Sequence, residues 1–563
     1  MKKVILSGCL LFLAALFLFT GCSNGLNAPA EGDARTLSGS GYTFAAMAPL
    51  HVTNWSEFEN QLVTARNLGI DAISVDVWWG DVEAAGDQVF DWSYYDTIFG
   101  KIRTAGLDIV PIMSFHQCGG NVGDDYDSYL PSWIWTHFAG VPAEDLKYRS
   151  ETGAYTAEYV SLWADDHVVS EYTEFMNAFE DRYGYMAADI LELNVSGGTA
   201  GELRYPSYNS HDWGGYPNRG TLQCYSDPAK EDFRDWLLAK YGSLAGINSA
   251  WGTSLGSTDQ INPPGNPDYF FSSYDYKNIQ YGKDLLDWYN QSLSDHGTRL
   301  INAAAAAFDD EFASIDLGMK IPGIHWMMGD PTYPRLAEMT AGLIPSSVNY
   351  QNSSTGYGYN NIISTFAATS RQVNLHFTCL EMGNENYSPA YSRAEDLVFY
   401  VAAAAAAQGV VIKGENALSG GVTTDAGWNK IENALQWASY SGLTVLRLGN
   451  VASGTGLRRY MGVINTYKAD SGDLTLHYSE WESATKYITH PWDGLSGDLD
   501  MSYEGFYNNA HWWFVRVYDR PNHFKFCFTN SNGNWDGTNR SFDAQGNEIY
   551  VQPWNSTVYT SRP

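Results

Sequence analysis

The sequence predicts an α/β protein: a (β/α)8 TIM barrel with long loops, followed by a C-terminal all-β sandwich domain. Eight short apolar runs recur along the first 450 residues, and helical patterns lie between several of them. Parallel strands that helices cover on both faces have such near-continuous apolar runs. Near Ala469 the pattern changes to short strands, Gly/Asn/Asp turns and many aromatic residues, which is typical of a β sandwich.

The apolar runs are the predicted barrel strands, and they occupy residues 42–50, 71–79, 107–116, 189–197, 317–326, 373–382, 409–418 and 443–450. Predicted helices between them include residues 56–69, 94–106, 170–184 and 396–409. An open, doubly wound sheet is the alternative, but no Gly-rich phosphate loop follows the first strand. We therefore assign the barrel to residues 42–470 and the sandwich to residues 472–563.

The N-terminus has the pattern of an export signal. Lys2 and Lys3 precede an apolar stretch, and "FTGC", which ends at Cys22, resembles a bacterial lipobox. We expect residues 1–21 to be a lipoprotein signal peptide, Cys22 to carry the lipid, and residues 22–41 to form a flexible tether. The protein is then expected at the cell envelope or cell surface. Ordinary secretion with cleavage near the same point is the alternative.

The charge balance excludes several classes of partner. The formal net charge is −31, from 33 basic and 64 acidic residues. Such a field repels nucleic acids and anionic lipids, so we expect no nucleic-acid partner and membrane contact only through the lipid anchor. The 20 Trp and 38 Tyr residues suit the faces of sugar rings, although large barrels are aromatic-rich in any case. We expect a monomer that acts on a neutral substrate.

Polar residues gather where the predicted strands end, which is where (β/α)8 barrels place their reactive groups. They include the carboxylates Glu202 and Glu415. Paired carboxyl groups on a scaffold suited to sugars indicate glycoside hydrolysis, in which one group stays protonated and the other is ionised. The sequence has no Gly-x-Ser-x-Gly elbow and no catalytic-metal spacing, so we expect no cofactor for catalysis.

Six sequence words at these strand ends resemble the signature segments of the beta-amylase family, in that family's order. They are "SVDVWWG", "SFHQCGGNVGD", "GELRYPSY", "GIHW", "FTCLEM" and "GENAL". The resemblance implies exo-acting hydrolysis of α-1,4-glucosidic bonds in starch, amylose and maltooligosaccharides from non-reducing ends, with release of β-maltose and inversion. Two alternatives stay open: a non-catalytic glucan-binding surface lipoprotein, and a barrel glycosidase that acts on another glucan.

The resemblance also implies residue roles. Glu202 matches the family's general acid and Glu415 its general base. The positions that match substrate contacts are Asp76, His116, Asp124, Lys320, His325, Trp326, Thr378, Asn416, Leu418 and Arg447. Asp124 lies in the segment that matches a loop closing over substrate. Asp76 and Arg447 could instead form an internal ion pair, and Glu381 could support the site or serve as an ion-pair partner.

A structural cation site is a further expectation. Glu83, Asp87 and Gln88 lie in one segment, and Glu171 and Glu174 lie three residues apart on one predicted helix. The five residues resemble a calcium site of bacterial beta-amylases, and hard oxygen ligands suit Ca²⁺. The ion would be structural and away from catalysis. A solvated acidic surface is the alternative.

The C-terminal region contains "YITHPWDG" and "FTNSNGNWDGTNR", which resemble segments of starch-binding β-sandwich modules of bacterial amylases. The resemblance implies that Trp492 and Trp535 stack on glucose rings and that His490 hydrogen-bonds a ring edge. The alternative is a structural cap whose tryptophans belong to its core.

Overall fold

The computed structural model describes all residues except 1–40, 120–122, 209–217, 327–334, 347–352, 388–390, 469–472, 481–485, 490–498, 519–522, 531–535, 537, 539 and 544–545. Several predicted features therefore lie outside the described residues: the signal peptide, Cys22, almost all of the tether, and the expected sugar-binding residues His490, Trp492 and Trp535. Among the helices of the described part, none is long and apolar enough to cross a membrane.

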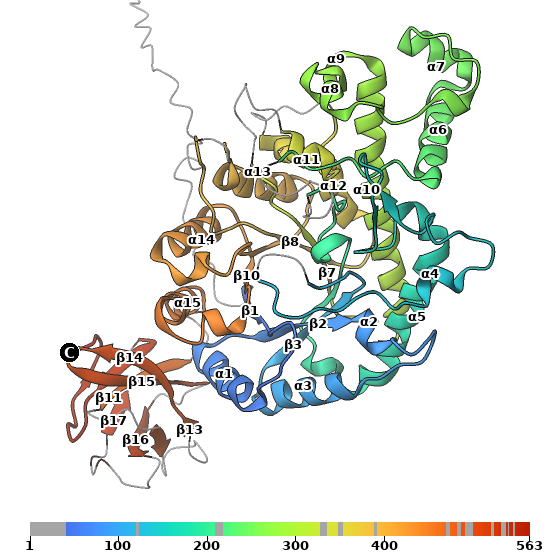
Figure 1. Ribbon diagram of the computed structural model, residues 1–563. Helices are drawn as coiled ribbons and strands as arrows, with labels where there is room; N and C mark the ends of the chain where they lie inside the picture. The colour runs from blue at the N-terminus through green and yellow to red at the C-terminus, as the bar shows by residue number, and fades with distance from the viewer. Residues whose placement is uncertain are drawn as a thin grey trace, which may run out of the picture.

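Eight parallel strands close into a barrel, which confirms the predicted fold class (Figure 1). The spatial order of the strands is β1-β10-β9-β8-β7-β6-β3-β2. Their bounds are β1 (Thr43–Met47), β2 (Ala72–Trp78), β3 (Asp108–Ser114), β6 (Leu193–Val195), β7 (Leu317–Ile321), β8 (Val373–Phe377), β9 (Ile412–Glu415) and β10 (Gly442–Val445). Seven of these strands lie within a predicted run, and β10 begins one residue before its run. The strand β6 is much shorter than its run.

Helices surround the barrel and bury one face each against the strands. In α1 (Trp55–Leu68), the buried Phe58, Leu62, Ala65 and Leu68 recur at helical spacing. Asn54 caps its first turn, and Gly69 ends it at φ 88°, in the left-handed region. The other long covering helices are α3 (Ser93–Thr104), α5 (Asp165–Tyr183), α10 (Gln280–Ala307), α13 (Ala394–Ala407), α14 (Asp425–Trp437) and α15 (Gly454–Tyr467).

Long excursions follow several strands and supply the loops above the barrel. Between β6 and α10 the chain forms α6 (Asp227–Tyr241), α7 (Leu244–Trp251), α8 (Pro267–Ser272) and α9 (Asp275–Asn278). Shorter elements are α2 (Trp79–Val82), α4 (Ile134–His137), β4 (Tyr148–Arg149), β5 (Tyr155–Thr156), α11 (Leu336–Thr340) and α12 (Asn360–Ser364). Eight 3-10 turns complete the barrel domain: Leu162–Ala164, Gly184–Asp189, Thr199–Gly201, Thr258–Gln260, Ser353–Gly358, Thr365–Ala367, Gly421–Thr423 and Leu448–Asn450, all within the described part.

The C-terminal region is a two-sheet β domain. One sheet has the order β14-β15-β11-β18-β19 and the other β13-β12-β16-β17. Buried side chains such as Leu476, Val515 and Phe528 form its own core. The strands are β11 (Leu474–Glu480), β12 (Lys486–Thr489), β13 (Leu499–Asp500), β14 (Ser502–Tyr507), β15 (Ala510–Val517), β16 (His523–Asn530), β17 (Arg540–Asp543), β18 (Glu548–Val551) and β19 (Val558–Tyr559).

The β domain packs beside α1 and α15 at the edge of the barrel (Figure 1). Phe514 of β15 belongs to the barrel's apolar cluster, whereas its neighbour Trp513 belongs to the sandwich core. Arg516 donates a hydrogen bond to the carbonyl of Leu68 at 2.9 Å. A Cβ on Gly69 would lie 2.6 Å from the Arg516 guanidinium, so this contact requires glycine there. Successive side chains of β15 thus point alternately toward the barrel and toward the sandwich core, and this joins the two domains.

Candidate active site

Glu202 lies beyond the end of β6, in a tight turn whose backbone places it at the barrel mouth. Ala200 and Gly201 have φ values of 58° and 77° in this turn. A Cβ on Gly201 would lie 3.1 Å from Cε1 of His116, so glycine is needed both for its φ and for the space beside the imidazole. The turn stores backbone strain at Ala200, as is common at functional sites.

The surroundings of Glu202 favour a carboxyl group that keeps its proton. Burial is the largest influence and raises its pKa, while Arg204 and Lys320 oppose that rise and Glu415 adds to it. Arg204 Nε donates a hydrogen bond to Glu202 Oε2 at 2.9 Å. The side chain of Glu202 nevertheless keeps 16% of its surface exposed, so a substrate can reach it. A buried but reachable carboxyl with a raised pKa is the arrangement a general acid needs.

Glu415 is the last residue of β9, and its side chain is 5% exposed. Lys320 Nζ lies 2.9 Å from its carboxylate oxygens. The backbone of Lys320 also pairs with Glu202, since the carbonyl of Lys320 accepts from Leu203 N at 2.8 Å. Lys320 therefore contacts the Glu415 carboxylate through its side chain and the segment that carries Glu202 through its backbone, and the three residues share one end of the barrel.

Asp76 lies on β2, and His116 follows the end of β3 by two residues, at the same rim of the barrel. The His116 ring meets Trp78 edge-on at 5.2 Å. Burial lowers the pKa of His116 to about 4, with Asp76 opposing that shift. The imidazole is therefore neutral near pH 7. Asp76 Oδ1 accepts a hydrogen bond from Ser114 Oγ at 2.9 Å.

Arg447 follows β10 and faces the same rim. Its Nη1 lies 3.7 Å from Met47 Sδ, and Lys320 Nζ lies 3.5 Å from that sulfur. Among the described residues no ion pair joins Arg447 to Asp76, so the structure does not contain the internal pair that the sequence left open. Burial raises the pKa of Cys118 to about 12, and Asp76 and Arg447 act on that thiol with opposite signs, which places it near both residues.

Aromatic and imidazole side chains extend the site away from Glu202. Arg204 lies over the ring of Tyr208 at 4.4 Å, and that ring meets Trp326 edge-on at 4.8 Å. Trp326 Nε1 donates to the carbonyl of Asn218 at 3.2 Å. His325 Nδ1 lies 2.7 Å from Ser392 Oγ, and burial lowers the pKa of His325 to about 4. His325 and Trp326 lie past the end of β7, although the sequence predicted them within the strand run 317–326.

The remaining predicted contacts lie in loops at the same end of the barrel. Thr378 Oγ1 accepts from Gly323 N at 2.9 Å, and Asp124 Oδ2 accepts from Gly119 N at 3.1 Å. Asn416 Oδ1 accepts from Leu446 N at 2.8 Å, and its Nδ2 donates to the carbonyl of Leu418 at 3.0 Å. Leu418 itself is 46% exposed.

Two residues of this site were missed by the sequence analysis. Arg204 contacts the expected acid directly, and its signal was its place inside the word "GELRYPSY", two residues after Glu202. Met47 contacts both Lys320 and Arg447 through its sulfur. Its position at the end of β1 was a weak signal, because an apolar residue there is expected to pack in the core.

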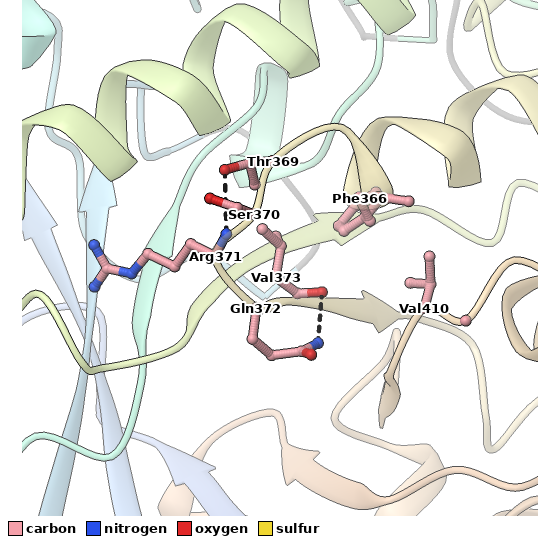
Figure 2. Close-up of a pocket in the computed structure, with 9 residues that line it drawn as sticks. Phe366, Thr369, Ser370, Arg371, Gln372, Val373 and Val410 are labelled. Atoms are coloured by element: carbon pink, nitrogen blue, oxygen red, sulfur yellow. Dashed lines mark hydrogen bonds between the residues drawn. The ribbon is translucent and has the colours of Figure 1, made fainter.

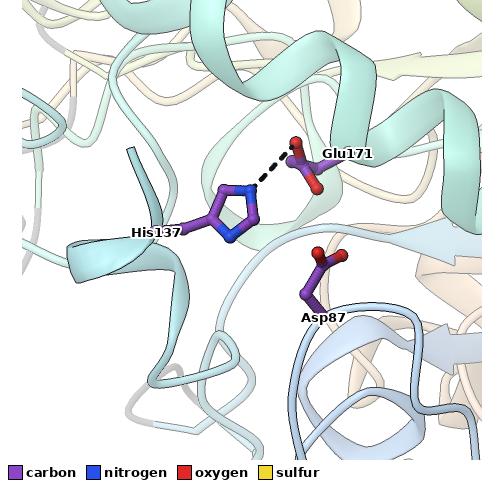
Figure 3. A group of neighbouring side chains, drawn as sticks. All are labelled: Asp87, His137 and Glu171. Atoms are coloured by element: carbon purple, nitrogen blue, oxygen red, sulfur yellow. Dashed lines mark ion pairs between the residues drawn. The ribbon is translucent and has the colours of Figure 1, made fainter. Parts of the chain in front are cut away.

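Two of the five expected cation ligands, Asp87 and Glu171, lie close together, and His137 joins them. Asp87, His137 and Glu171 have potential ligand atoms within 4.8 Å of one another (Figure 3). His137 Nε2 lies 3.6 Å from Glu171 Oε1. Glu83 accepts from Trp79 Nε1 and from Gln88 N, both at 2.6 Å. His137 comes from α4, remote in sequence from the other members, and the sequence analysis missed it.

The electrostatics of this cluster fit a bound cation. Burial raises the pKa of Glu83 to about 7, with the hydrogen bonds from Trp79 and Gln88 opposing the rise and the carboxylates Asp87 and Glu171 adding to it. Burial likewise raises the pKa of Glu171, with Glu174 adding to the rise. Gln88 Nε2 donates to Glu174 at 2.7 Å and so joins the two segments. Several carboxyl groups that penalise one another's ionisation would be relieved by a divalent ion.

A cavity at the opposite end of the barrel lacks such chemistry. It is lined by residues that precede β8 and β9, including Arg371 and Val410 (Figure 2). The Arg371 guanidinium points away from Val410 and donates to the carbonyls of Phe308, Phe312 and Ile315. The Arg371 guanidinium thus binds backbone carbonyl groups and does not face the cavity. We conclude that this cavity is not the active site.

A (β/α)8 barrel with a buried carboxyl group of raised pKa and a lysine-bound carboxylate at its C-terminal face is the arrangement expected of a glycoside hydrolase. Residues 45–469 match the family model described as "Glycosyl hydrolase family 14". The chain therefore belongs to glycosyl hydrolase family 14.

Beta-amylases of bacteria are similar to most or all of the chain. The sequence is 34% identical to a "Beta-amylase" from Bacillus cereus, covering 100% of both chains. It is 42% identical to a "Thermophilic beta-amylase" from Thermoanaerobacterium thermosulfurigenes over 73% of this chain and 71% of the relative. The crystal structure of the catalytic domain of beta-amylase from Paenibacillus polymyxa is similar with a TM-score of 0.68 and 38% identity, covering 77% of this chain and 100% of that one.

Proposed function

We propose that the protein hydrolyses α-1,4-glucosidic bonds in starch and related glucans from non-reducing ends and releases β-maltose with inversion. Family membership and the beta-amylase relatives support the substrate and product. The single observation that carries the mechanism is the pairing of Glu202, whose pKa burial raises, with Glu415, whose carboxylate Lys320 contacts at 2.9 Å.

Glu202 acts as the general acid. Its proton is transferred to the glycosidic oxygen as the bond to the leaving chain breaks. Arg204, at 2.9 Å, fixes the orientation of the carboxyl group and stabilises the carboxylate that forms. Burial outweighs this cation and raises the pKa of Glu202, which favours the protonated form of the acid before the reaction.

Glu415 acts as the general base. It accepts a proton from a water molecule that attacks the anomeric carbon from the face opposite the leaving group, so a single displacement inverts the configuration. Lys320 orients the carboxylate for this role. The neutral His116 together with Asp76 and Arg447 surrounds the site with groups that can hydrogen-bond sugar hydroxyls, and the Trp326 ring offers a face for a glucose unit.

Product analysis tests the function. Amylose with free non-reducing ends should give maltose as the first and dominant product, detected by chromatography. Amylose whose non-reducing ends are chemically blocked should resist the enzyme. Glucan binding without any product would identify a non-catalytic capture protein, and cleavage of β-linked glucans in place of starch would identify another barrel glycosidase.

The β domain, residues 472–563, is proposed to bind starch. Sequence resemblance supports this proposal, with Trp492 and Trp535 stacking on glucose rings and His490 hydrogen-bonding an edge. The contacts of Arg516 and Phe514 with the barrel would keep such a surface at a fixed distance from the active site.

A structural Ca²⁺ is proposed at the carboxylate cluster. Glu83, Asp87, Gln88, Glu171 and Glu174 would supply hard oxygen ligands. The raised pKa values of Glu83 and Glu171 support the proposal, because a bound cation would stabilise the ionised form of both carboxyl groups. The ion would join α5 to the segment after α2, away from the catalytic carboxyl groups.

Export as a lipid-anchored monomer is proposed from the sequence of residues 1–22. Replacement of Cys22 by Ser should release the protein from the membrane fraction into the medium, as followed by immunoblotting. Membrane attachment that persists in this variant would refute the anchor. Light scattering of the purified protein should give the mass of a single chain.

A further inference from the structure

Glu381 is a buried carboxylate that the mechanism has not used. It follows β8 and is 7% exposed. Its two oxygens accept hydrogen bonds from consecutive backbone amides: Oε2 from Ala417 N at 3.0 Å and Oε1 from Leu418 N at 2.8 Å. No lysine or arginine of the described residues forms an ion pair with it, so the sequence's alternative of an ion-pair partner is not what the structure contains.

The amides that Glu381 holds belong to the chain that carries the base. Ala417 and Leu418 follow Glu415 by two and three residues. A third hydrogen bond fixes the base residue itself, since Leu380 N donates to the carbonyl of Glu415 at 3.2 Å. Residues 380 and 381 thus tie the loop after β8 to the loop after β9 on both sides of Asn416.

The space around Glu381 is shaped for it by two glycines. A Cβ on Gly421 would lie 2.1 Å from Glu381 Cγ, and a Cβ on Gly427 would lie 3.3 Å from Glu381 Cβ. Burial raises the pKa of Glu381 to about 7, with the amides of Leu418 and Ala417 opposing that rise. Burial of a carboxylate without a neighbouring cation costs free energy, and the hydrogen bonds that Glu381 accepts from the two amides offset part of that cost.

We infer that Glu381 is a positioning residue: by binding the amides of Ala417 and Leu418, it fixes the backbone that aims the Glu415 carboxylate and presents Asn416 and Leu418 to substrate. This inference rests on the proposed function, because it assigns Glu381 a role through the base. Its loss should lower turnover more than substrate affinity, because the base takes up the proton of the water only in the transition state.

Glu381→Gln is the sharpest test, because glutamine keeps the shape but turns one acceptor into a donor facing a backbone N–H. Misplacement of a catalytic group by about 1 Å reduces rates by about 10²-fold, so we expect kcat to fall by about 10- to 100-fold with KM changed by less than about 3-fold. Rates are divided by the folded fraction from circular dichroism. Glu381→Asp, which keeps the charge, should recover part of kcat.

Glu180→Gln is the matched control. Glu180 is also a buried glutamate, 5% exposed, that accepts a backbone amide, Phe312 N at 2.6 Å, and burial raises its pKa too. It lies on α5, outside the barrel. We expect it to lower thermal stability as much as Glu381→Gln does, with kcat unchanged.

Amide hydrogen exchange supplies a readout that does not depend on activity. Protection of Ala417 and Leu418 should fall in Glu381→Gln and stay at the wild-type level in Glu180→Gln. Wild-type kcat in Glu381→Gln, unchanged protection of these amides, or an equal loss of kcat in the control would each overturn the inference. If the wild-type enzyme releases no maltose while the exchange result holds, the proposed function fails and the tie between the loops stands.

Gly421→Ala is a second route if Glu381→Gln does not fold. The added methyl group would press on Glu381 without changing any charge. We expect the same loss of kcat with KM little changed, and a variant that folds with wild-type kcat would count against the inference.

Discussion

Two buried carboxylate clusters lie along the same barrel strands, and they differ in how completely their charges are matched. Glu192, just before β6, is 1% exposed and accepts hydrogen bonds from His376, Asn374 and Lys413. Burial opposes its ionisation, but His376 and Lys413 together lower its pKa to about 2. Every oxygen of this carboxylate has a fixed partner, so the cluster holds the barrel interior together.

Glu415 lies two residues after Lys413 on β9 and has far fewer partners. Among the described residues only Lys320 donates a hydrogen bond to its side chain. Glu202 likewise receives a side-chain hydrogen bond from Arg204 alone within that part of the chain. Both oxygens of Glu192 thus have hydrogen-bond partners within the protein, whereas Glu202 and Glu415 can still bind a water molecule or a sugar oxygen.

Removing the rim carboxylates should have the largest effect. Glu202→Gln cannot donate the proton, and Glu415→Gln cannot accept one, so kcat should fall by about 10²–10⁴-fold or more in each. Each substitution also leaves a largely buried cation, Arg204 or Lys320, without its carboxylate, so rates are divided by the folded fraction. Near-normal turnover in either variant would contradict its role.

Replacement of Glu192 should instead lower stability and leave turnover nearly unchanged. Glu192→Gln leaves Lys413 buried without its counter-charge, so the free energy of unfolding should fall by about 3–5 kcal/mol, measured by denaturant titration. The folded fraction should keep kcat within a few-fold. An unchanged stability with lost turnover would reverse the assignment of the two clusters.

The pH dependence of stability sharpens this contrast. The pKa of Glu192 is about 2 in the folded protein, below its ordinary value of 4.5, so its contribution to stability is present above pH 4.5 and is lost as pH falls toward 2. Acid unfolding should therefore become less steep over this window in Glu192→Gln.

Replacement of Arg204 tests how this residue affects the pKa of Glu202. Arg204 lowers the pKa of Glu202 against the larger effect of burial. Arg204→Met should therefore raise that pKa further, and the alkaline limb of the kcat–pH profile should move to higher pH, because the acid must be protonated. Arg299→Met, which removes a partner of Asp165 on α5, is the control and should leave the limb in place. A shift to lower pH would contradict the account.

The cation cluster should affect stability without affecting turnover. A ligand at about 100 times its Kd stabilises the folded state by about 2.7 kcal/mol, so Ca²⁺ should raise Tm by a few degrees and a chelator should reverse the change. Glu171→Gln should remove the response, while Glu395→Gln, which alters a glutamate paired with Lys430 elsewhere, should retain it. A Tm that is insensitive to Ca²⁺ in the wild-type protein would refute the site.

The smallest effect is expected in the β domain. Trp535→Ala should reduce co-sedimentation with starch granules by a few-fold, as a stacked ring contributes about 1 kcal/mol or more. Hydrolysis of soluble starch should be unchanged. An unaltered granule pull-down would remove Trp535 from a binding surface.

The sequence predicted the barrel because its strands are buried on both faces and leave uninterrupted apolar runs. It misjudged the extent of β6: the run covers residues 189–197, whereas the strand is Leu193–Val195. Glu192 is buried beside that strand as a polar core group, and the chain then turns sharply at Ala200 and Gly201. Neither feature follows from a pattern of apolar residues.

The position of Glu202 and Glu415 at one end of the barrel could be predicted because each lies within a distinctive word at a strand end. Contacts across loops could not. His137 approaches Glu171 only because α4 folds back toward α5, and Glu381 meets the amides of Ala417 and Leu418 only because the loops after β8 and β9 pack together. Such pairings depend on three-dimensional loop paths, and the spacing of residues in the chain carries little information about them.

The anomeric configuration of the first product tests the account most directly. Purified enzyme and amylose are followed by proton NMR from the first minutes, before mutarotation equilibrates the sugar. A base-activated water at Glu415 predicts that the β anomer of maltose appears first and the α anomer grows in later. If α-maltose appears first, a carboxylate attacks the sugar itself and the assigned roles of Glu202 and Glu415 are wrong.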